Sequence, residues 1–272
     1  MMKAYVQTRS GLIHYVTAGD GPALILLHET PRSLRMYAQM IPHLPGFRVV
    51  ALDSPGFGES HKVPGDYSIT DYAMNVVSVM DALNLPHAHI FGDHTGAAIA
   101  VETAIAAPER VGRLILSGLP FWLNEQERIE RHRQVVARDL IAKSDDGSHV
   151  MRIWAFLKGR IPGGERGLNP ADMELLSEIT LDALRAGPAW KQVEILMSIY
   201  DPMPRLPLVK APTLAIGVTG EGTSIYTKRP RDVAALVPRG IAHVMEGIDG
   251  RVISTHAGDI AAVVKNFLNA DL

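Results

Sequence analysis

Short apolar runs and helical patterns alternate along the first 119 residues of the chain. The runs are rich in β-branched and aliphatic residues, as buried strands are. They are Ala23–Leu27, Phe47–Leu52, His89–Phe91 and Arg113–Leu116, and the helical patterns between them are Ser33–Leu44, Thr70–Leu83 and Thr95–Ala107. A helix between two strands returns the chain across the sheet, so the strands pair in parallel. The sequence therefore predicts an α/β fold with a mainly parallel central sheet and helices on both faces.

The pattern changes at Pro120. From there to about Leu208 there is no convincing strand, and charged amphipathic helices follow one another. Strand signals return at Thr213–Val218. We therefore expect residues 1–119 and 209–272 to form one core. Residues 120–208 are expected to form a helical lid, inserted in the core and lying over one end of the sheet.

Composition and charge exclude several kinds of function. Lysine and arginine number 27 against 29 acids, without a block of like charge, so nucleic acid is not expected as a partner. The absence of cysteine excludes disulfides and thiolate sites, and the histidines show no ligand spacing, so neither a metal nor a cofactor is expected. No apolar run approaches the roughly 18 residues of a membrane span, and the N-terminal residues show no signal core. We expect a cytoplasmic protein that does not bind membranes.

Four short segments stand in an order and spacing that resemble the α/β-hydrolase fold family. They are Leu26-Leu27-His28-Glu29-Thr30-Pro31, Leu52-Asp53-Ser54-Pro55-Gly56-Phe57-Gly58-Glu59-Ser60, Phe91-Gly92-Asp93-His94-Thr95-Gly96-Ala97 and Ala211-Pro212-Thr213-Leu214-Ala215-Ile216. The resemblance is greatest to the capped branch that includes haloalkane dehalogenases and epoxide hydrolases. It implies an enzyme with a small-molecule substrate, and it leaves monomer and homodimer both open.

The third segment matches the turn that carries the family's nucleophile. Small residues must flank the central residue of that turn, because it has a strained backbone, and Gly92 and Gly96 meet this demand. The central residue is His94, where the family has serine, aspartate or cysteine. The resemblance implies that the amides of Thr30 and Thr95 form an oxyanion hole.

The family's other catalytic positions are changed as well. Counting from Pro212 places Glu221 in the position of the catalytic acid. The position of the family's histidine holds Gly250-Arg251, and the nearest histidine, His256, lies five residues further on.

Three interpretations of His94 follow. In the first, the site is inactive, and the fold serves as a ligand-binding scaffold. Alternatively, Glu221 holds the far nitrogen of His94, and the two form a general-base dyad. In the third, His256 reaches the site and His94 is accessory. The dyad favours a cofactor-free hydrolase of a small apolar carbonyl compound, an ester or lactone, and would also suit a lyase or isomerase.

Five further residues are candidates for substrate binding. Glu29 is either a second acid of the site or a solvated loop residue, and His28 either supports its loop or takes part in chemistry. Arg251 is the better anion-binding candidate, because arginine engages carboxylates with two hydrogen bonds. Trp122 and Trp154 belong to the lid core or line an apolar pocket.

Overall fold

A single sheet forms the centre of the computed structural model. The structure describes residues 1–63, 65–120, 124–161, 163–220, 229–249 and 252–271. The eight strands of this sheet have the order β1-β2-β4-β3-β5-β6-β7-β8. β2 is antiparallel to both its neighbours, and the other pairs are parallel, so the sheet is mainly parallel as predicted. The strands are β1 (Met2–Gln7), β2 (Leu12–Ala18), β3 (Ala23–Leu27), β4 (Arg48–Leu52), β5 (Ala88–Asp93), β6 (Val111–Ser117), β7 (Thr213–Val218) and β8 (Gly240–Met245).

Helices cover both faces of the sheet. Every residue of β3 and of β7 is buried, which explains why their sequences are continuous apolar runs. One face packs against α1 (Ile69–Ala82), α2 (Thr95–Ala106) and α7 (Pro230–Leu236). The opposite face packs against α9 (Ala257–Asn269), which follows the short helix α8 (Val252–Thr255). These two layers confirm the predicted α/β architecture.

The segment predicted as one helix at Ser33–Leu44 forms two short 3₁₀ turns instead, η1 (Leu34–Tyr37) and η2 (Ile41–His43). Pro42 explains the difference, because proline has no backbone N–H and its ring disfavours the helical conformation at the residue before it. The apolar residues of the segment still pack on the sheet, since Tyr37 and Met40 are fully buried.

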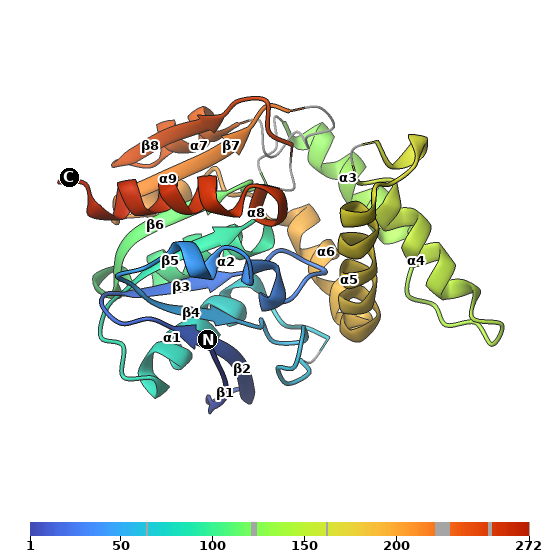
Figure 1. Cartoon of the computed structure of the whole chain (residues 1–272), viewed down its shortest axis with the longest axis horizontal. Helices are drawn as coiled ribbons and strands as arrows, with labels where there is room; N and C mark the ends of the chain where they lie inside the picture. Colours follow the sequence, from blue (N-terminus) through green and yellow to red (C-terminus); the bar gives the residue numbers. More distant parts are fainter. Residues whose placement is uncertain (64, 121–123, 162, 221–228, 250–251, 272) are drawn as a thin grey trace.

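Four helices stand between β6 and β7, and they lie beyond the carboxyl ends of the parallel strands (Figure 1). Asn124 and Asn169 cap the first and third of them, each accepting a hydrogen bond from the backbone N–H three residues on. The first packs against the fourth, and the second against the third. We call them the inserted helices: α3 (Glu125–Ala137), α4 (Ser148–Lys158), α5 (Pro170–Ala186) and α6 (Pro188–Ile199).

Buried charged side chains join the inserted helices to the core at two places. Asp182 of α5 accepts hydrogen bonds from Ser33 Oγ at 3.0 Å and from the Arg35 guanidinium at 3.1 Å. After α6, Arg205 donates two hydrogen bonds of 2.8 and 2.7 Å to the carboxylate of Glu102 in α2. Asp182 and Glu102 are almost fully buried, so each needs the partner that it has. Among the described residues, none of the helices combines the length and the apolar character needed to cross a bilayer.

Candidate active site

The turn between β5 and α2 has the geometry that its glycines require. His94 follows the last residue of β5 and has φ 46° and ψ −104°, a strained conformation that non-glycine residues rarely adopt. Its N–H donates to the Ser117 carbonyl of the neighbouring strand at 2.8 Å. A Cβ atom at Gly92 would overlap the Gly96 carbonyl, and one at Gly96 would overlap the Leu27 carbonyl. The backbone packing alone therefore demands small residues at both positions.

Two threonine hydroxyls lie beside His94. Thr95 begins α2, and its Oγ1 is 3.3 Å from His94 Nδ1 and 2.9 Å from the Oγ1 of Thr30, in the loop after β3. The first amides of a helix have no partner within the helix, and its dipole favours negative charge at that end. The structure thus brings together His94, Thr30 and Thr95, the three residues that the sequence placed around a reacting carbonyl group.

His94 is uncharged at neutral pH. Burial lowers the pKa of its imidazole to about 4, and the positive charges of Arg160 and Arg131 contribute to this shift. Above about pH 5 the ring therefore carries a single N–H and no charge. It can accept a proton or take part in a hydrogen bond, but it does not provide a permanent positive charge.

Two carboxyl groups next to the turn, those of Asp93 and Glu29, interact with each other. Asp93 hydrogen-bonds to Ser117, and burial, together with the nearby charge of Glu29, raises its pKa to about 8. Burial also raises the pKa of Glu29, while Arg32 and Arg160 oppose the increase. Because the two groups interact, together they retain a proton near neutrality. Glu29 is half-buried, with Oε1 3.8 Å from the Arg32 guanidinium.

Hydrogen bonds to the Asp53 carboxylate stabilise the end of the loop that carries Thr30. This buried carboxylate accepts hydrogen bonds from the backbone N–H of Leu34 at 2.8 Å and of Glu59 at 2.9 Å. His14 Nδ1 lies 2.6 Å from the same carboxylate. A Cβ at Gly58, where φ is 51°, would overlap the carboxylate, which explains the glycine of the second motif. That motif therefore positions the site and does not take part in the chemistry.

His28 and His256 lie in different surroundings from His94. His28 is fully buried; its Nδ1 donates to the Glu29 carbonyl, and its Nε2 accepts from the Ser54 N–H, both at 2.9 Å. Both ring nitrogens are therefore occupied by backbone groups of the loops after β3 and β4. His256 precedes α9, and its Nδ1 is 3.3 Å from Asp259 of the same helix.

The other candidates are divided between the inserted helices and the residues outside the described part of the chain. Trp154 in α4 is partly buried and packs against the hydrophobic core. Glu221, Trp122 and Arg251 lie outside the described residues. In the part of the chain that the structure describes, no three histidine, aspartate or glutamate side chains are grouped so that they could hold a metal ion.

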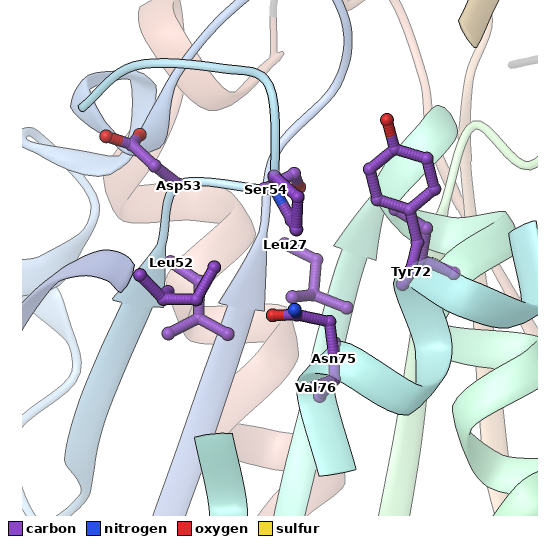
Figure 2. A pocket seen from close by; sticks show the side chains of 10 residues that line it. Leu27, Leu52, Asp53, Ser54, Tyr72, Asn75 and Val76 are labelled. Carbon is purple, nitrogen blue, oxygen red and sulfur yellow. The ribbon is translucent and has the colours of Figure 1, made fainter. Parts of the chain in front are cut away.

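A small cavity lies between the sheet and α1 (Figure 2). Its volume is about 10 Å³, and Leu27, Asp53, Tyr72 and Asn75 are among the residues that line it. The buried hydroxyl of Tyr72 has no hydrogen-bond partner among the described residues. A space of this size can admit at most a water molecule, so it is not a substrate site.

Sequence reasoning missed two parts of the site. One is the interaction of Asp93 with Glu29, which depends on the pairing of β5 with β3. The other is the influence of Arg131 and Arg160 on His94. In the sequence Arg131 looks like a solvated residue of an amphipathic helix and Arg160 like a solvated residue after one, and nothing in their spacing indicates the turn at His94.

The chain is similar to known hydrolases over part of its length. A family model described as "alpha/beta hydrolase fold" matches residues 22–195. The 2-hydroxy-6-oxo-6-phenylhexa-2,4-dienoate hydrolase of Comamonas testosteroni is 40% identical over 113 residues, 39% of this chain and 40% of that protein. The bifunctional epoxide hydrolase 2 of Mus musculus is 35% identical over 125 residues, 43% of this chain and 22% of that protein. The matches thus span less than half the length of these curated relatives.

Solved structures resemble the chain over nearly its whole length. The enol-lactonase from Burkholderia xenovorans LB400 superposes with a TM-score of 0.79 at 20% identity, covering 98% of this chain and 100% of that one. A thermophilic esterase from Thermogutta terrifontis gives a TM-score of 0.79 at 20% identity, covering 98% of both chains. At these identities the likeness concerns the fold alone.

Proposed function

Because the chain belongs to the α/β-hydrolase fold family, we propose that it is a hydrolase that acts on the carbonyl group of a small ester or lactone at His94. The observation that carries the proposal is the position of His94. The ring stands on the strained turn at the start of α2, beside Thr95 and Thr30. A turn kept in this geometry presents its side chain where the carbonyl carbon would lie, with the helix amides facing the developing oxyanion.

In the proposed reaction, His94 acts as the general base. Water attacks the carbonyl carbon, its proton passes to a ring nitrogen of His94, and the carbonyl electrons move to the oxygen held by the amides of Thr30 and Thr95. Collapse of the tetrahedral intermediate expels the alkoxide, which takes the proton from the His94 imidazolium and leaves as the alcohol. The imidazole is uncharged at neutral pH, so it can act as a base at the start of the reaction. Glu221 remains the residue proposed to hold the far nitrogen.

The inserted helices fit the role of a lid in this proposal. They stand beyond the carboxyl ends of the strands (Figure 1), and His94 directly follows the carboxyl end of β5. Arg131 of α3 and Arg160, just after α4, both lower its pKa. A cover over this end of the sheet would exclude water from the reacting carbonyl and strengthen the electrostatic interactions beneath it.

The exchange His94→Ala tests the proposal. A panel of para-nitrophenyl esters of short acids and of five- and six-membered lactones is assayed with both proteins. We expect His94→Ala to lose about a hundredfold or more in kcat/KM, which is the usual contribution of a general base. Circular dichroism and the melting temperature of the variant should show an intact fold.

The control is His256→Ala, because His256 stands just before α9, partly exposed, with Asp259 as its partner. It should leave turnover unchanged. Full activity of His94→Ala would refute the proposal, and loss of activity in the His256 variant would favour a rebuilt triad. If the wild type hydrolyses nothing but melts at a higher temperature with a ligand, the protein is a binding module.

A further inference from the structure

Two hydroxyl groups connect the loop after β3 to the ring of His94. The Oγ1 atom of Thr95 lies 2.9 Å from Thr30 Oγ1 and 3.3 Å from His94 Nδ1. Thr95 is 1% exposed, whereas Thr30 and His94 at the two ends of the row are partly exposed. The hydroxyl of Thr95 is therefore enclosed between its two neighbours. We call the row of Thr30 Oγ1, Thr95 Oγ1 and His94 Nδ1 the hydroxyl chain.

Hydrogen atoms can run along the hydroxyl chain in two directions. In the first, Nδ1–H of His94 donates to Thr95, and the hydroxyl of Thr95 donates to Thr30. In the second, Thr30 donates to Thr95, and Thr95 donates to Nδ1. The ring is uncharged at neutral pH, so it carries one hydrogen. The first direction places that hydrogen on Nδ1 and the second places it on Nε2.

The two distances favour the first direction. Hydrogen bonds donated by O–H to oxygen span about 2.5–3.0 Å between heavy atoms, whereas those donated by N–H extend to about 3.2 Å. The contact of 2.9 Å between the two threonine oxygens fits an O–H donor. The contact of 3.3 Å at the ring is long for an O–H donor and closer to the range of an N–H donor. Thr95 thus gives its one hydrogen to Thr30 and accepts that of His94.

The position of Nδ1 leads to the same tautomer. Nδ1 points toward the buried hydroxyl of Thr95, so in the proposed reaction the attacking water uses Nε2 as its base. A nitrogen that accepts a proton carries no hydrogen beforehand. The hydrogen of the neutral ring is then on Nδ1.

We propose that Thr95 holds His94 in the Nδ1–H tautomer, and that Thr30 donates its hydroxyl hydrogen to the carbonyl oxygen of the substrate. Thr95 is then a positioning residue, because it acts through His94. Thr30 is a catalytic residue through its side chain as well as through its amide. The inference rests on the proposed function for the donation to the carbonyl oxygen, but not for the tautomer.

The hydroxyl chain would couple the base to the oxyanion. When Nε2 takes the proton of water, the imidazolium becomes a stronger donor at Nδ1. Hydrogen bonds in a row polarise one another, so the donation from Thr30 to the developing oxyanion strengthens at the same moment. No proton moves along the row, and each hydroxyl keeps its own hydrogen. Glu221 would contact the far nitrogen only after Nε2 has been protonated.

Nuclear magnetic resonance of the protein with isotope-labelled histidine tests the tautomer without a substrate. The chemical shifts of the two ring nitrogens at pH 7 show which of them carries the hydrogen, and His94→Ala identifies the signals of His94. We expect Nδ1–H in the wild type. Thr95→Val keeps the shape of the side chain but has no hydroxyl, so it should lose the preference for Nδ1–H. Thr95→Ser has the hydroxyl and should retain the preference.

The matched control is Thr103→Val. Thr103 is also a fully buried threonine of α2, but its hydroxyl donates to the Ile99 carbonyl of the same helix at 2.8 Å. This variant should keep the Nδ1–H tautomer. An Nε2–H ring in the wild type would overturn the proposal, and so would a preference for Nδ1–H that persists in Thr95→Val.

Turnover of the ester panel tests the role of Thr30. We expect Thr30→Val and Thr95→Val each to lose about tenfold or more in kcat, since each removes a hydrogen bond that strengthens in the transition state. The KM should change by less than about twofold. Thr30→Val should keep the Nδ1–H tautomer, which separates its role from that of Thr95, and Thr103→Val should keep the wild-type kcat. An unchanged kcat in Thr30→Val would refute the donation to the carbonyl oxygen.

The two measurements separate this inference from the proposed function. An Nδ1–H ring that depends on Thr95, in a protein that hydrolyses no ester, would refute the hydrolase and leave the role of Thr95 intact. Hydrolysis that depends on His94, by a protein whose ring is in the Nε2–H form, would refute the hydroxyl chain and leave the hydrolase intact.

Discussion

At the scale of single residues, the charge state of His94 decides what the site can do. A histidine in water has a pKa near 6.5, whereas burial and the arginines hold that of His94 at about 4. The ring thus gives up part of its strength as a base, but it stays uncharged over the whole physiological range. Burial shifts the pKa of the carboxyl pair of Asp93 and Glu29 in the opposite direction, upward, so the pair retains a proton near neutrality.

The pH dependence of kcat/KM should report this charge state. For a neutral ester, activity should fall on the acid side with a midpoint near pH 4, because protonation of the imidazole removes its lone pair. Arg160→Gln removes a positive charge that disfavours the imidazolium ion, so the midpoint should move toward 6.5. Arg131 remains in that variant, so its charge still lowers the pKa of His94. Asp93 titrates at higher pH and would affect only the alkaline limb of the pH profile. A wild-type midpoint near 6.5 that the variant does not move would contradict the assignment.

Asp93 should make the folded protein less stable as the pH rises. Its pKa is about 8 in the fold against an ordinary value of 3.8, so between these values the folded state holds a proton that the unfolded state has released. The free energy of unfolding therefore falls with rising pH from about pH 4 to about pH 8. Asp93→Asn should remove this contribution, and the melting temperature of wild type minus that of the variant should decrease between pH 5 and pH 8.

Asp145→Asn, an exchange of an exposed aspartate in the turn before α4, is the control. Its melting temperature should run parallel to that of the wild type at every pH. A constant difference between wild type and Asp93→Asn across the pH range would show that Asp93 is ionised in the fold.

The glycine spacing of the turn is a local pattern with a local cause, so the sequence was sufficient to single out His94 and Thr95 as candidates, and the structure places Thr30 beside Thr95. The sequence was not sufficient to find Arg131 and Arg160. Long cationic side chains on amphipathic helices are usually solvated, and only the folded arrangement shows which of them face a site.

At the scale of elements, the strands could be predicted better than the connections. Ala23–Leu27 and Thr213–Val218 have the bounds that their apolar runs predict, since burial on both faces leaves a continuous signal. The amphipathic pattern at the start of the inserted segment extends from Glu125 to Lys143, but the first inserted helix ends at Ala137. There Asp139 accepts a hydrogen bond from the Ala142 N–H, and a turn held by an aspartate side chain competes with the helix.

The contact of α5 with the loop after β3 should contribute to stability. Asp182 is buried and accepts hydrogen bonds from Ser33 and Arg35. Asp182→Ala leaves the Ser33 hydroxyl buried without this partner, and we expect it to lower the free energy of unfolding by about 1–3 kcal/mol. Urea denaturation followed by circular dichroism measures the change.

Glu174→Ala on the exposed face of the same helix is the matched control, and it should change the free energy of unfolding by less than about 0.5 kcal/mol. If both variants lose the same stability, the contact of Asp182 with the loop contributes nothing of its own.

At the scale of the whole molecule, the mainly parallel sheet with helices on both faces follows from the alternation of strand and helix patterns. The architecture is a general property of the pattern, and it was predicted. The pKa values at the candidate site depend on the side chains of Glu29, Asp93 and Arg160, which are far apart in sequence. Their meeting depends on the register of the strands and on the packing of the inserted helices, neither of which a single sequence reveals.

The turn at His94 has a consequence for how such a protein changes over time. The backbone N–H of His94 donates to the Ser117 carbonyl, and the carbonyls of Gly96 and Leu27 leave no room for a Cβ atom at Gly92 and Gly96; none of these contacts involves the imidazole. The backbone therefore supports the exchange of one side chain for another without requiring the fold to adapt. Position 94 is a place where evolution, or an engineer, can replace the reactive group by a single codon change and keep the machinery around it.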